Sequence, residues 1–192
     1  MKLGAVILAA GQGSRLGGVA KALLPIGDTT FLGRICETAR SVGLADTIVV
    51  VGPPHGALVA SRAGELGLRV IVNAEPDRGM ASSVALGFRA IADTDCDAAW
   101  LWPVDHPSVT AETLRQLVAA LGAHAVAQPR FAGRGGHPPL VARVAWPKFA
   151  ESETRREGAR SVLGELDVVA IEVADPGVVQ DVDTPEHARA LV

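Results

Sequence analysis

Short runs of apolar residues alternate along the chain with longer segments in which apolar positions recur every three or four residues. In the first three short runs the apolar residues are consecutive, which is typical of parallel strands that helices cover on both faces. The longer segments have helical spacing, and three of them finish at a glycine, as helices often do. The predicted strands are 5–10, 47–52, 69–73, 98–105 and 123–129, and the predicted helices are 31–43, 55–67, 82–93 and 110–122.

Strands and helices follow one another in strict alternation through the first 129 residues. This order predicts an α/β fold with a largely parallel sheet between two helical layers, because parallel neighbours need a crossover that packs on the sheet. After Gln128 the rhythm changes: segment 129–140 is rich in Gly, Pro and Arg, and a short helix near 158–166 precedes a strand at 168–173. Since no repeat or linker interrupts the chain, we expect one domain over residues 1–192.

Composition and charge narrow the classes of partner. Hydrophobic residues make up 48% of the chain and aromatic residues only 4%, so aliphatic side chains and Ala must build a globular core. The formal net charge of −3 provides no basic footprint for nucleic acid or an anionic membrane, and no apolar run approaches the ~20 residues of a membrane span. Cys36 and Cys96 match no disulfide framework or metal motif. We therefore expect a cytoplasmic protein with two buried free thiols rather than a disulfide.

The segment LAAGQGSRLGGVAKALLP (8–25) follows the first predicted strand, where open α/β sheets bind ligands. It matches neither familiar phosphate loop. A dinucleotide fingerprint needs Gly-x-Gly-x-x-Gly, and Gly11, Gly13 and Gly17 miss the last spacing by one residue. A P-loop needs Gly-Lys-Ser/Thr, whereas Lys21 lies between two alanines.

The same segment nevertheless carries groups that suit a triphosphate. Gly11 and Gly13 leave backbone amides bare, and Arg15 and Lys21 are cations that neutralise a triphosphate and its departing pyrophosphate. No acid lies close to Lys21 in the sequence, so we expect its side chain to be exposed. The alternative is a glycine-rich turn with solvated cations.

Five segments resemble motifs of one enzyme family. Segment 8–25 resembles the signature of the nucleotidyltransferases related to the molybdenum cofactor cytidylyl- and guanylyltransferases. The other four follow in the family's order: NAEPDRGMASSVALGF (73–88), PVDHP (103–107), GGHPPLVAR (135–143) and DVDTPEHARAL (181–191). The resemblance implies a Rossmann-like, three-layer α/β/α sandwich. It also implies transfer of a nucleotide from an NTP to a phosphate acceptor, with release of pyrophosphate.

The resemblance implies roles for individual residues. Arg15, Lys21 and Asp105 would be catalytic. The expected nucleotide-binding residues are Ala9, Ala10, Gly11, Gly13, Arg15, Lys21, Asn73, Gly79 and Ser82. The Ala-Ala-Gly start of the loop resembles the cytidylyl branch, so CTP is the expected nucleotide. Gln12 and His106 stand where many relatives carry Ser and Gln, which leaves the acceptor open.

Asp105 ends a buried predicted strand and is flanked by Pro103 and Pro107. A carboxylate there is costly unless it is solvated, paired or bound to a metal. We expect a metal ligand. The alternative is an N-cap of the next helix, although Ser108 and Thr110 lie closer to that helix and Thr110 with Thr113 offers a cap of its own.

Asp181 and Asp183 lie two residues apart, so on extended backbone they point to the same side. Magnesium prefers oxygen ligands and keeps phosphate and water oxygens in its shell. The resemblance favours Asp105 and Asp183 as the Mg²⁺ ligands, with Asp181 as the alternative to Asp183. The Asp-Thr-Pro-Glu run that contains Asp183 also suits the start of the last helix, and both roles are compatible.

Two further segments carry candidate binding residues. Asn73, Gly79, Ser82 and Ser83 follow the third strand, where they suit contact with a base or ribose, and Ser82 as a helix N-cap is the alternative. Met80 is expected either against a base or in the core. His137 lies in a stiff Gly-Gly-His-Pro-Pro stretch, and we expect it to contact the acceptor.

Together these patterns predict a Mg²⁺-dependent nucleotidyltransferase that moves CMP from CTP onto a molybdopterin-type acceptor. The resemblance implies a molybdoenzyme or its chaperone as protein partner, and neither nucleic acid nor membrane is expected. Two alternatives stay open: transfer to a sugar or polyol phosphate, and a non-catalytic, nucleotide-binding regulatory protein of the same fold. The presence of Arg15, Lys21, Asp105 and Asp183 disfavours the last.

Overall fold

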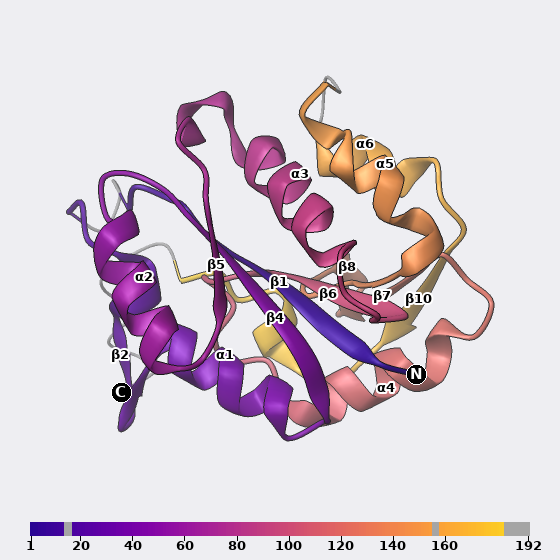
Figure 1. Cartoon of the computed structure of the whole chain (residues 1–192). Helices are drawn as coiled ribbons and strands as arrows, with labels where there is room; N and C mark the ends of the chain where they lie inside the picture. The colour runs from indigo at the N-terminus through magenta and orange to yellow at the C-terminus, as the bar shows by residue number, and fades with distance from the viewer. Residues whose placement is uncertain (14–16, 155–157, 183–192) are drawn as a thin grey trace.

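A mixed, mostly parallel sheet forms the centre of the molecule (Figure 1). The computed structural model describes residues 1–13, 17–154 and 158–182. The strands of the main sheet are β1 (Leu3–Ala9), β4 (Leu44–Val51), β5 (Arg69–Val72), β6 (Ala98–Pro103), β7 (Val126–Phe131), β8 (Arg134–Gly135), β9 (Leu140–Ala142) and β10 (Val168–Glu172). Their order is β10-β7-β9-β6-β1-β4-β5, with β8 paired to β7, and β2 (Pro25–Ile26) and β3 (Thr29–Thr30) form a separate hairpin.

Most neighbouring strands of the main sheet run parallel. β1 pairs in parallel with β4 and β6, β4 with β5, and β10 with β7. β9 lies antiparallel between β6 and β7, and β8 is antiparallel to β7. The short connection from β7 to β9 leaves no room for a crossover helix, so the returning strand has to run antiparallel.

Helices cover both faces of the sheet. α1 (Phe31–Arg40), α2 (Gly56–Glu65) and α4 (Ala111–Leu121) pack on one face, and α3 (Met80–Ile91), α5 (Trp146–Ala150) and α6 (Ala159–Gly164) on the other (Figure 1). Shorter helical turns are η2 (Lys21–Leu23), η3 (Pro76–Arg78), η4 (Arg143–Ala145), η5 (Ser152–Thr154) and η6 (Pro176–Val178). The predicted three-layer α/β/α sandwich is confirmed. Among the described residues no helix combines the length and hydropathy that crossing a bilayer requires.

Burial explains why the strand sequences are apolar at consecutive positions. All seven residues of β1 are buried, with Ile7 in the core under α1, α2 and α4 and Val6 in the core under α3 and α5. Gly87 lets α3 approach the sheet closely, because a Cβ at this position would lie 2.2 Å from Val6 Cγ1. Both sheet faces therefore demand apolar side chains along the central strands.

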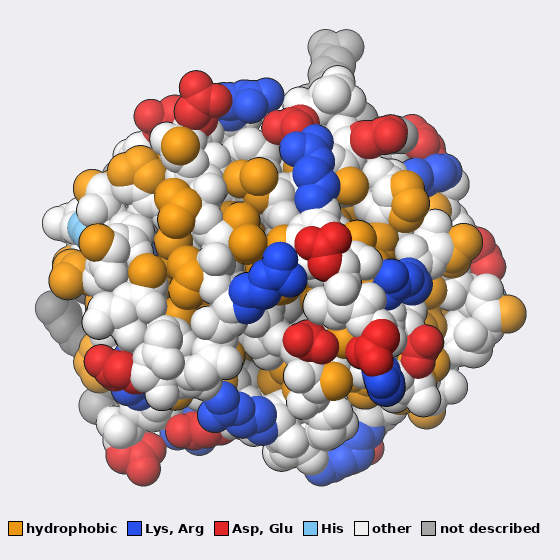
Figure 2. Space-filling model, viewed as in Figure 1, with side chains coloured by type: hydrophobic (Ala, Val, Ile, Leu, Met, Phe, Trp, Pro, Cys, Tyr) orange, Lys and Arg blue, Asp and Glu red, His pale blue; other side chains and the backbone are white. Residues whose placement is uncertain are grey.

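The face of the molecule shown in Figure 2 has an apolar area and a charged area. Apolar side chains gather over β5 and α2, where Val72 and Leu58 are exposed (Figure 2). Elsewhere on this face acidic and basic side chains are intermixed. No large single-sign patch is visible on this face, in keeping with the small net charge.

Strand order creates a crevice beside β1. From β1 the chain proceeds outward to β4 and β5, and then crosses back to β6 on the other side of β1. Leu8 is in register with Pro103, and the Val104 amide donates a hydrogen bond to the Leu8 carbonyl at 3.1 Å. The loops after β1 and β6 therefore leave the sheet side by side and diverge, which is where open α/β sheets hold ligands.

Candidate active site

The loops after β1 and β6 frame a cavity of about 430 Å³. It is lined by Leu8, Ala9, Ala10, Gly11, Gly13, Lys21, Pro76, Met80, Ser83, Pro103, Val104 and Asp105. The structure thus brings together the predicted loop residues of 9–13, the predicted cation Lys21 and the predicted ligand Asp105. Arg15, which was expected beside them, lies outside the described residues.

The two loop glycines differ in what they do. Gly13 has φ +62°, and a Cβ there would lie 1.9 Å from the Val19 carbonyl oxygen, so only glycine fits this turn. The Gly18 amide closes the turn by donating to the Gly13 carbonyl at 3.0 Å. Gly11 instead faces open space, with no atom within 4 Å of a Cβ at that position. Its backbone is therefore accessible from the cavity.

Lys21 and Asp105 form an ion pair across the cavity, with 3.7 Å between Lys21 Nζ and Asp105 Oδ2. Their side chains are only 16% and 23% exposed. The expectation of an exposed Lys21 is therefore wrong. The prediction considered only acids close in sequence, whereas the folding of η2 beside α1 brings this lysine to the end of β6.

Asp105 has one oxygen without a hydrogen-bond partner. Its Oδ1 is buried and accepts no hydrogen bond from any described residue, and His106 Nε2 lies 3.8 Å from it. The alternative that Asp105 caps α4 is wrong, because the Thr110 side chain is the N-cap and accepts from the Thr113 amide. A buried, unsatisfied carboxylate oxygen costs free energy, which makes it a strong acceptor for an incoming donor or cation.

Acidic ligands around Asp105 are few. No group of three or more His, Cys, Asp or Glu residues suited to a metal occurs among residues 1–13, 17–154 and 158–182. Asp181 is exposed and lies near Asp105, whereas Asp183 lies outside the described part of the chain. The expected pairing of Asp105 with Asp183 stays a prediction.

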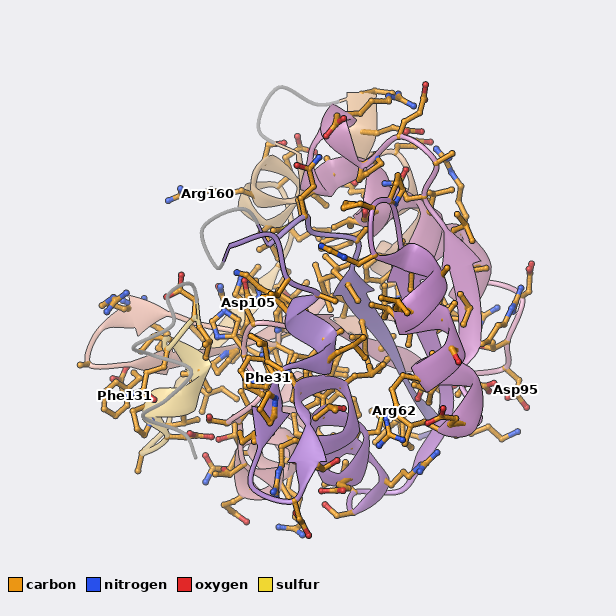
Figure 3. The ribbon with its side chains drawn as sticks, turned by 90° about the vertical axis from the view of Figure 1, so that its left-hand side faces the viewer. Phe31, Arg62, Asp95, Asp105, Phe131 and Arg160 are labelled. Carbon is orange, nitrogen blue, oxygen red and sulfur yellow. The ribbon has the colours of Figure 1, made fainter. Side chains whose placement is uncertain are left out.

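A second cavity of about 270 Å³ adjoins the first. Met80, Pro103 and Asp105 line both cavities. The remaining residues that line the second cavity are His106, Arg134, Gly135, His137, Val178, Val179 and Asp181. Asp105 therefore stands where the two cavities meet, and Figure 3 shows it on the same side of the molecule as Phe131, which ends β7 before the β8 hairpin.

Two histidines form one wall of the second cavity, with ring centroids 5.1 Å apart. His106 is buried and its Nδ1 lies 3.3 Å from the Gly177 carbonyl oxygen. Burial, together with the charge of His106, lowers the pKa of His137 to about 4, so its imidazole is neutral at pH 7. No pattern in the sequence gives His106 a role, because its position beside His137 arises only from tertiary contacts.

The segment after β10 closes the second cavity and is held by Asp175. This buried carboxylate accepts hydrogen bonds at its Oδ2 from the Thr110 amide (2.8 Å), the Thr110 hydroxyl (2.9 Å) and the Thr113 hydroxyl (2.7 Å). Its Oδ1 accepts from the Gly177 amide at 2.9 Å. Farther along, the Val182 amide donates to the Asp105 carbonyl at 2.9 Å. Asp175 was missed in the sequence, where nothing distinguishes it from a surface acid.

The 73–83 segment differs in detail from expectation. Asn73 Nδ2 donates to Ser82 Oγ at 2.8 Å and to Ser83 Oγ at 2.9 Å, and all three residues are buried. Ser82 is not the N-cap of α3, because that position belongs to Gly79, and Ser82 Oγ donates to the Gly79 carbonyl. Ser83 lines the first cavity, whereas Asn73, Gly79 and Ser82 do not, so their contact with nucleotide stays a prediction.

Met80 and Gln12 are both exposed, and Met80 lines the first cavity. Met80 is 64% exposed, so it is not core filler. Gln12 Nε2 donates to Asp77 Oδ1 at 2.6 Å and thereby connects the glycine loop to η3. η3 directly precedes α3, which begins at Met80, so this hydrogen bond joins the glycine loop to the segment that carries Met80.

Comparisons with known proteins relate this architecture to proteins of the same shape. The family model of the MobA-like NTP transferase domain matches residues 5–169. The nicotine blue oxidoreductase of Paenarthrobacter nicotinovorans is 29% identical over 97% of this chain and 95% of its own length. The molybdenum cofactor guanylyltransferase of Cereibacter sphaeroides is 34% identical over 77% of this chain and 70% of its own.

Solved structures with the same fold cover the whole of this chain. The crystal structure of Rv0371c from Mycobacterium tuberculosis is 28% identical, with a TM-score of 0.83 over 100% of this chain and 98% of that one. A complex of Rv0371c with manganese has a TM-score of 0.76 over the same shares of both chains.

Proposed function

The chain belongs to the MobA-like NTP transferase domain family, a family of nucleotidyltransferases, and on that premise we propose that it moves CMP from CTP onto a molybdopterin-type phosphate acceptor in a Mg²⁺-dependent reaction. The observation that carries the proposal is the ion pair of Lys21 with Asp105 where the two cavities meet. We assign the nucleotide to the first cavity and the acceptor to the second, and the whole activity to one domain of residues 1–192.

The reaction is an in-line displacement at the α-phosphorus. An oxygen of the acceptor phosphate forms the new P–O bond while the bond to the pyrophosphate oxygen breaks, and pyrophosphate leaves with both electrons of that bond. Lys21 stabilises the negative charge that develops on the transferring group and on pyrophosphate. The accessible backbone at Gly11 and the turn at Gly13 hold phosphate oxygens through amides. Arg15 is proposed as a second cation of this loop.

The residues at Asp105 fit a divalent cation that arrives with the nucleotide. Mg²⁺ is usually held by one or two carboxylates plus substrate phosphates and water, so a preformed cluster of three acids is not needed. The Oδ1 of Asp105, buried and without a hydrogen-bond partner among the described residues, is the oxygen ligand that such a cation requires. Asp183 is proposed as the second ligand, with Asp181 as the alternative. Bound there, Mg²⁺ would neutralise charge on the transferring phosphoryl group. The manganese complex of Rv0371c supports a divalent cation.

The glycine loop and His137 indicate the base and the acceptor. The Ala9-Ala10-Gly11 start supports CTP, whereas the Cereibacter sphaeroides relative is named a guanylyltransferase, so GTP is the main competitor. His137, neutral and facing the second cavity, is proposed to contact the acceptor through hydrogen bonds. A molybdoenzyme or its chaperone is the proposed recipient of the product.

Pyrophosphate release tests the proposal. The protein is incubated with Mg²⁺, each of the four NTPs in turn, and either molybdopterin or a panel of sugar and polyol phosphates. We expect release with CTP and molybdopterin, and none from the Asp105→Ala protein. Release only with a sugar or polyol phosphate supports the transferase alternative. Nucleotide binding without release under any condition supports the non-catalytic, regulatory alternative.

A further inference from the structure

Arg134 stands out among the residues that line the second cavity. It is the one Lys or Arg among the described residues that line this cavity. The other charged side chains there are the carboxylates of Asp105 and Asp181, and the nearby His137 is neutral at pH 7. The described lining of this cavity therefore carries two carboxylates and one permanent positive charge.

The guanidinium of Arg134 also has no hydrogen-bond or ionic partner within the part of the chain that the structure describes. Other arginines of the region are engaged: Arg130, in the same hairpin, donates to the Gly133 carbonyl, and Arg143 donates to three backbone carbonyls. Beyond the backbone pairing of Arg134 with Phe131, the Arg134 side chain makes no hydrogen bond or ion pair with any described residue. Within the described residues, its guanidinium thus keeps its donors for a ligand.

The hairpin that carries Arg134 is held in place. The turn residues Ala132 and Gly133 have φ of +50° and +77°, as in the tight turns that match the twist of a two-stranded hairpin. The Gly133 amide donates to Glu172 Oε1 at 3.1 Å, which fastens the hairpin to β10. Next to β8, a Cβ on Gly136 would lie 2.5 Å from the Val178 carbonyl oxygen, so the chain packs tightly against η6.

We propose that Arg134 binds the anionic phosphate of the acceptor in the second cavity. This inference rests on the proposed function, because it concerns the second substrate of the same reaction. A phosphomonoester carries nearly two negative charges at neutral pH. Asp105 and Asp181 would repel it, and a planar guanidinium can bind two of its oxygens at once. Arg134 therefore selects acceptors that carry a phosphate and holds them against that repulsion.

Chemical modification tests the binding without any turnover. Phenylglyoxal modifies arginines that have no ionic partner, and peptide mass spectrometry measures the rate at each arginine as inorganic phosphate is increased. Arg160 of α6 is the internal control. Its side chain is exposed and, like that of Arg134, has no partner among the described residues. It lines neither cavity and lies apart from Asp105 in Figure 3. We expect phosphate to slow modification of Arg134 severalfold and to leave Arg160 unchanged. Equal rates of loss at both arginines, or no protection of Arg134, overturn the proposal.

Kinetics of three variants test the role in the reaction. Arg134→Gln should raise the KM for molybdopterin about ten- to a hundredfold, as expected for loss of a charge-assisted hydrogen bond. The KM for CTP and the melting temperature should not change. Arg134→Lys should restore part of the affinity, and Arg160→Gln should behave as wild type. An unchanged acceptor KM, or parallel changes in both KM values with a lowered melting temperature, contradicts the proposal. If the wild-type protein releases no pyrophosphate with any acceptor, the proposed function fails, and phosphate protection still decides the role of Arg134.

Discussion

Lys21 Nζ lies 3.7 Å from Asp105 Oδ2, although the two residues come from elements far apart in the chain. Lys21 belongs to η2 after the glycine loop, and Asp105 follows β6. Each is mostly buried and each lines the first cavity, so a cation and a carboxylate face the same cavity. On the proposed function, we expect Lys21 to exchange Asp105 for the triphosphate, and Asp105 to exchange Lys21 for the metal, when the substrate binds.

Removal of the cation should slow the reaction more than it loosens the fold. For Lys21→Ala we expect kcat/KM to fall about 10²–10³-fold, the loss typical of one preorganised transition-state donor. Steady-state pyrophosphate release measures the change. Lys148→Ala is the matched control. Lys148 belongs to α5, its Nζ lies 3.8 Å from Glu165 Oε2, and it lines neither cavity. A rate equal to that of wild type would argue against the phosphate role.

Removal of the proposed metal ligand should abolish turnover. Asp105→Ala loses the carboxylate oxygen that has no other partner, so Mg²⁺ dependence should weaken and stability without metal should change little. The rise in melting temperature that Mg²⁺ and CTP produce in wild type by mass action should shrink, as thermal scans can show. Asp183→Ala should have the same effect and Asp181→Ala a milder one. A nucleotide complex with Asp105 more than ~4 Å from any cation, against the ~2.1 Å of direct coordination, would refute the assignment.

The base preference is testable by direct competition. Ala9 and Ala10 begin the loop, and a small side chain at position 10 sets how closely a base approaches the backbone. We expect CTP to be consumed in preference to GTP when both are present at equal concentration with Mg²⁺ and molybdopterin. Chromatography of the remaining nucleotides measures the ratio. Equal or faster consumption of GTP would reject CTP and leave the family assignment intact.

Asp175 should matter for both stability and acceptor binding. Asp175→Ala leaves the donors of Thr110, Thr113 and Gly177 without their acceptor in a buried place, which should lower the free energy of unfolding by about 2–4 kcal/mol. The loosened segment after β10 should raise the KM for the acceptor more than that for CTP. Urea unfolding and steady-state kinetics provide the two measurements. Asp93→Ala, which removes an exposed ion pair, should leave both nearly unchanged.

The lowered pKa of His137 makes stability depend on pH below neutrality. Burial is the main cause, and the value of about 4 lies below the 6.5 of an unfolded histidine. Between these values the unfolded chain binds a proton that the folded protein does not, so the free energy of unfolding should fall as pH drops from about 6.5 to about 4. Urea unfolding at a series of pH values measures this dependence. The free energy of unfolding should fall less steeply with decreasing pH for His137→Gln than for wild type. Identical slopes would show that His137 does not titrate as expected.

Local sequence rules predicted most of the architecture. Consecutive apolar residues such as those of β1 and the second half of β4 are typical of strands covered on both faces, and the structure buries them there. Thr110 was expected to cap α4 from its position alone, and it does. The glycine loop was placed correctly because the Gly13 turn is a local backbone requirement. The antiparallel insertion of β9 was not foreseen, since strand order depends on contacts between distant segments.

The sequence by itself determined the type and order of the elements and the chemistry carried by the loops after β1 and β6, because hydrophobic period, turn residues and motif spacing are local properties. Only the tertiary structure decided which side chains meet. It paired Lys21 with Asp105, set His106 against His137, buried Asp175 under the start of α4, and left Arg134 unpartnered beside the second cavity among the described residues. These relationships depend on how the sheet orders its strands and how short segments pack across it. The free energy of each such contact is set by residues that are distant in the chain.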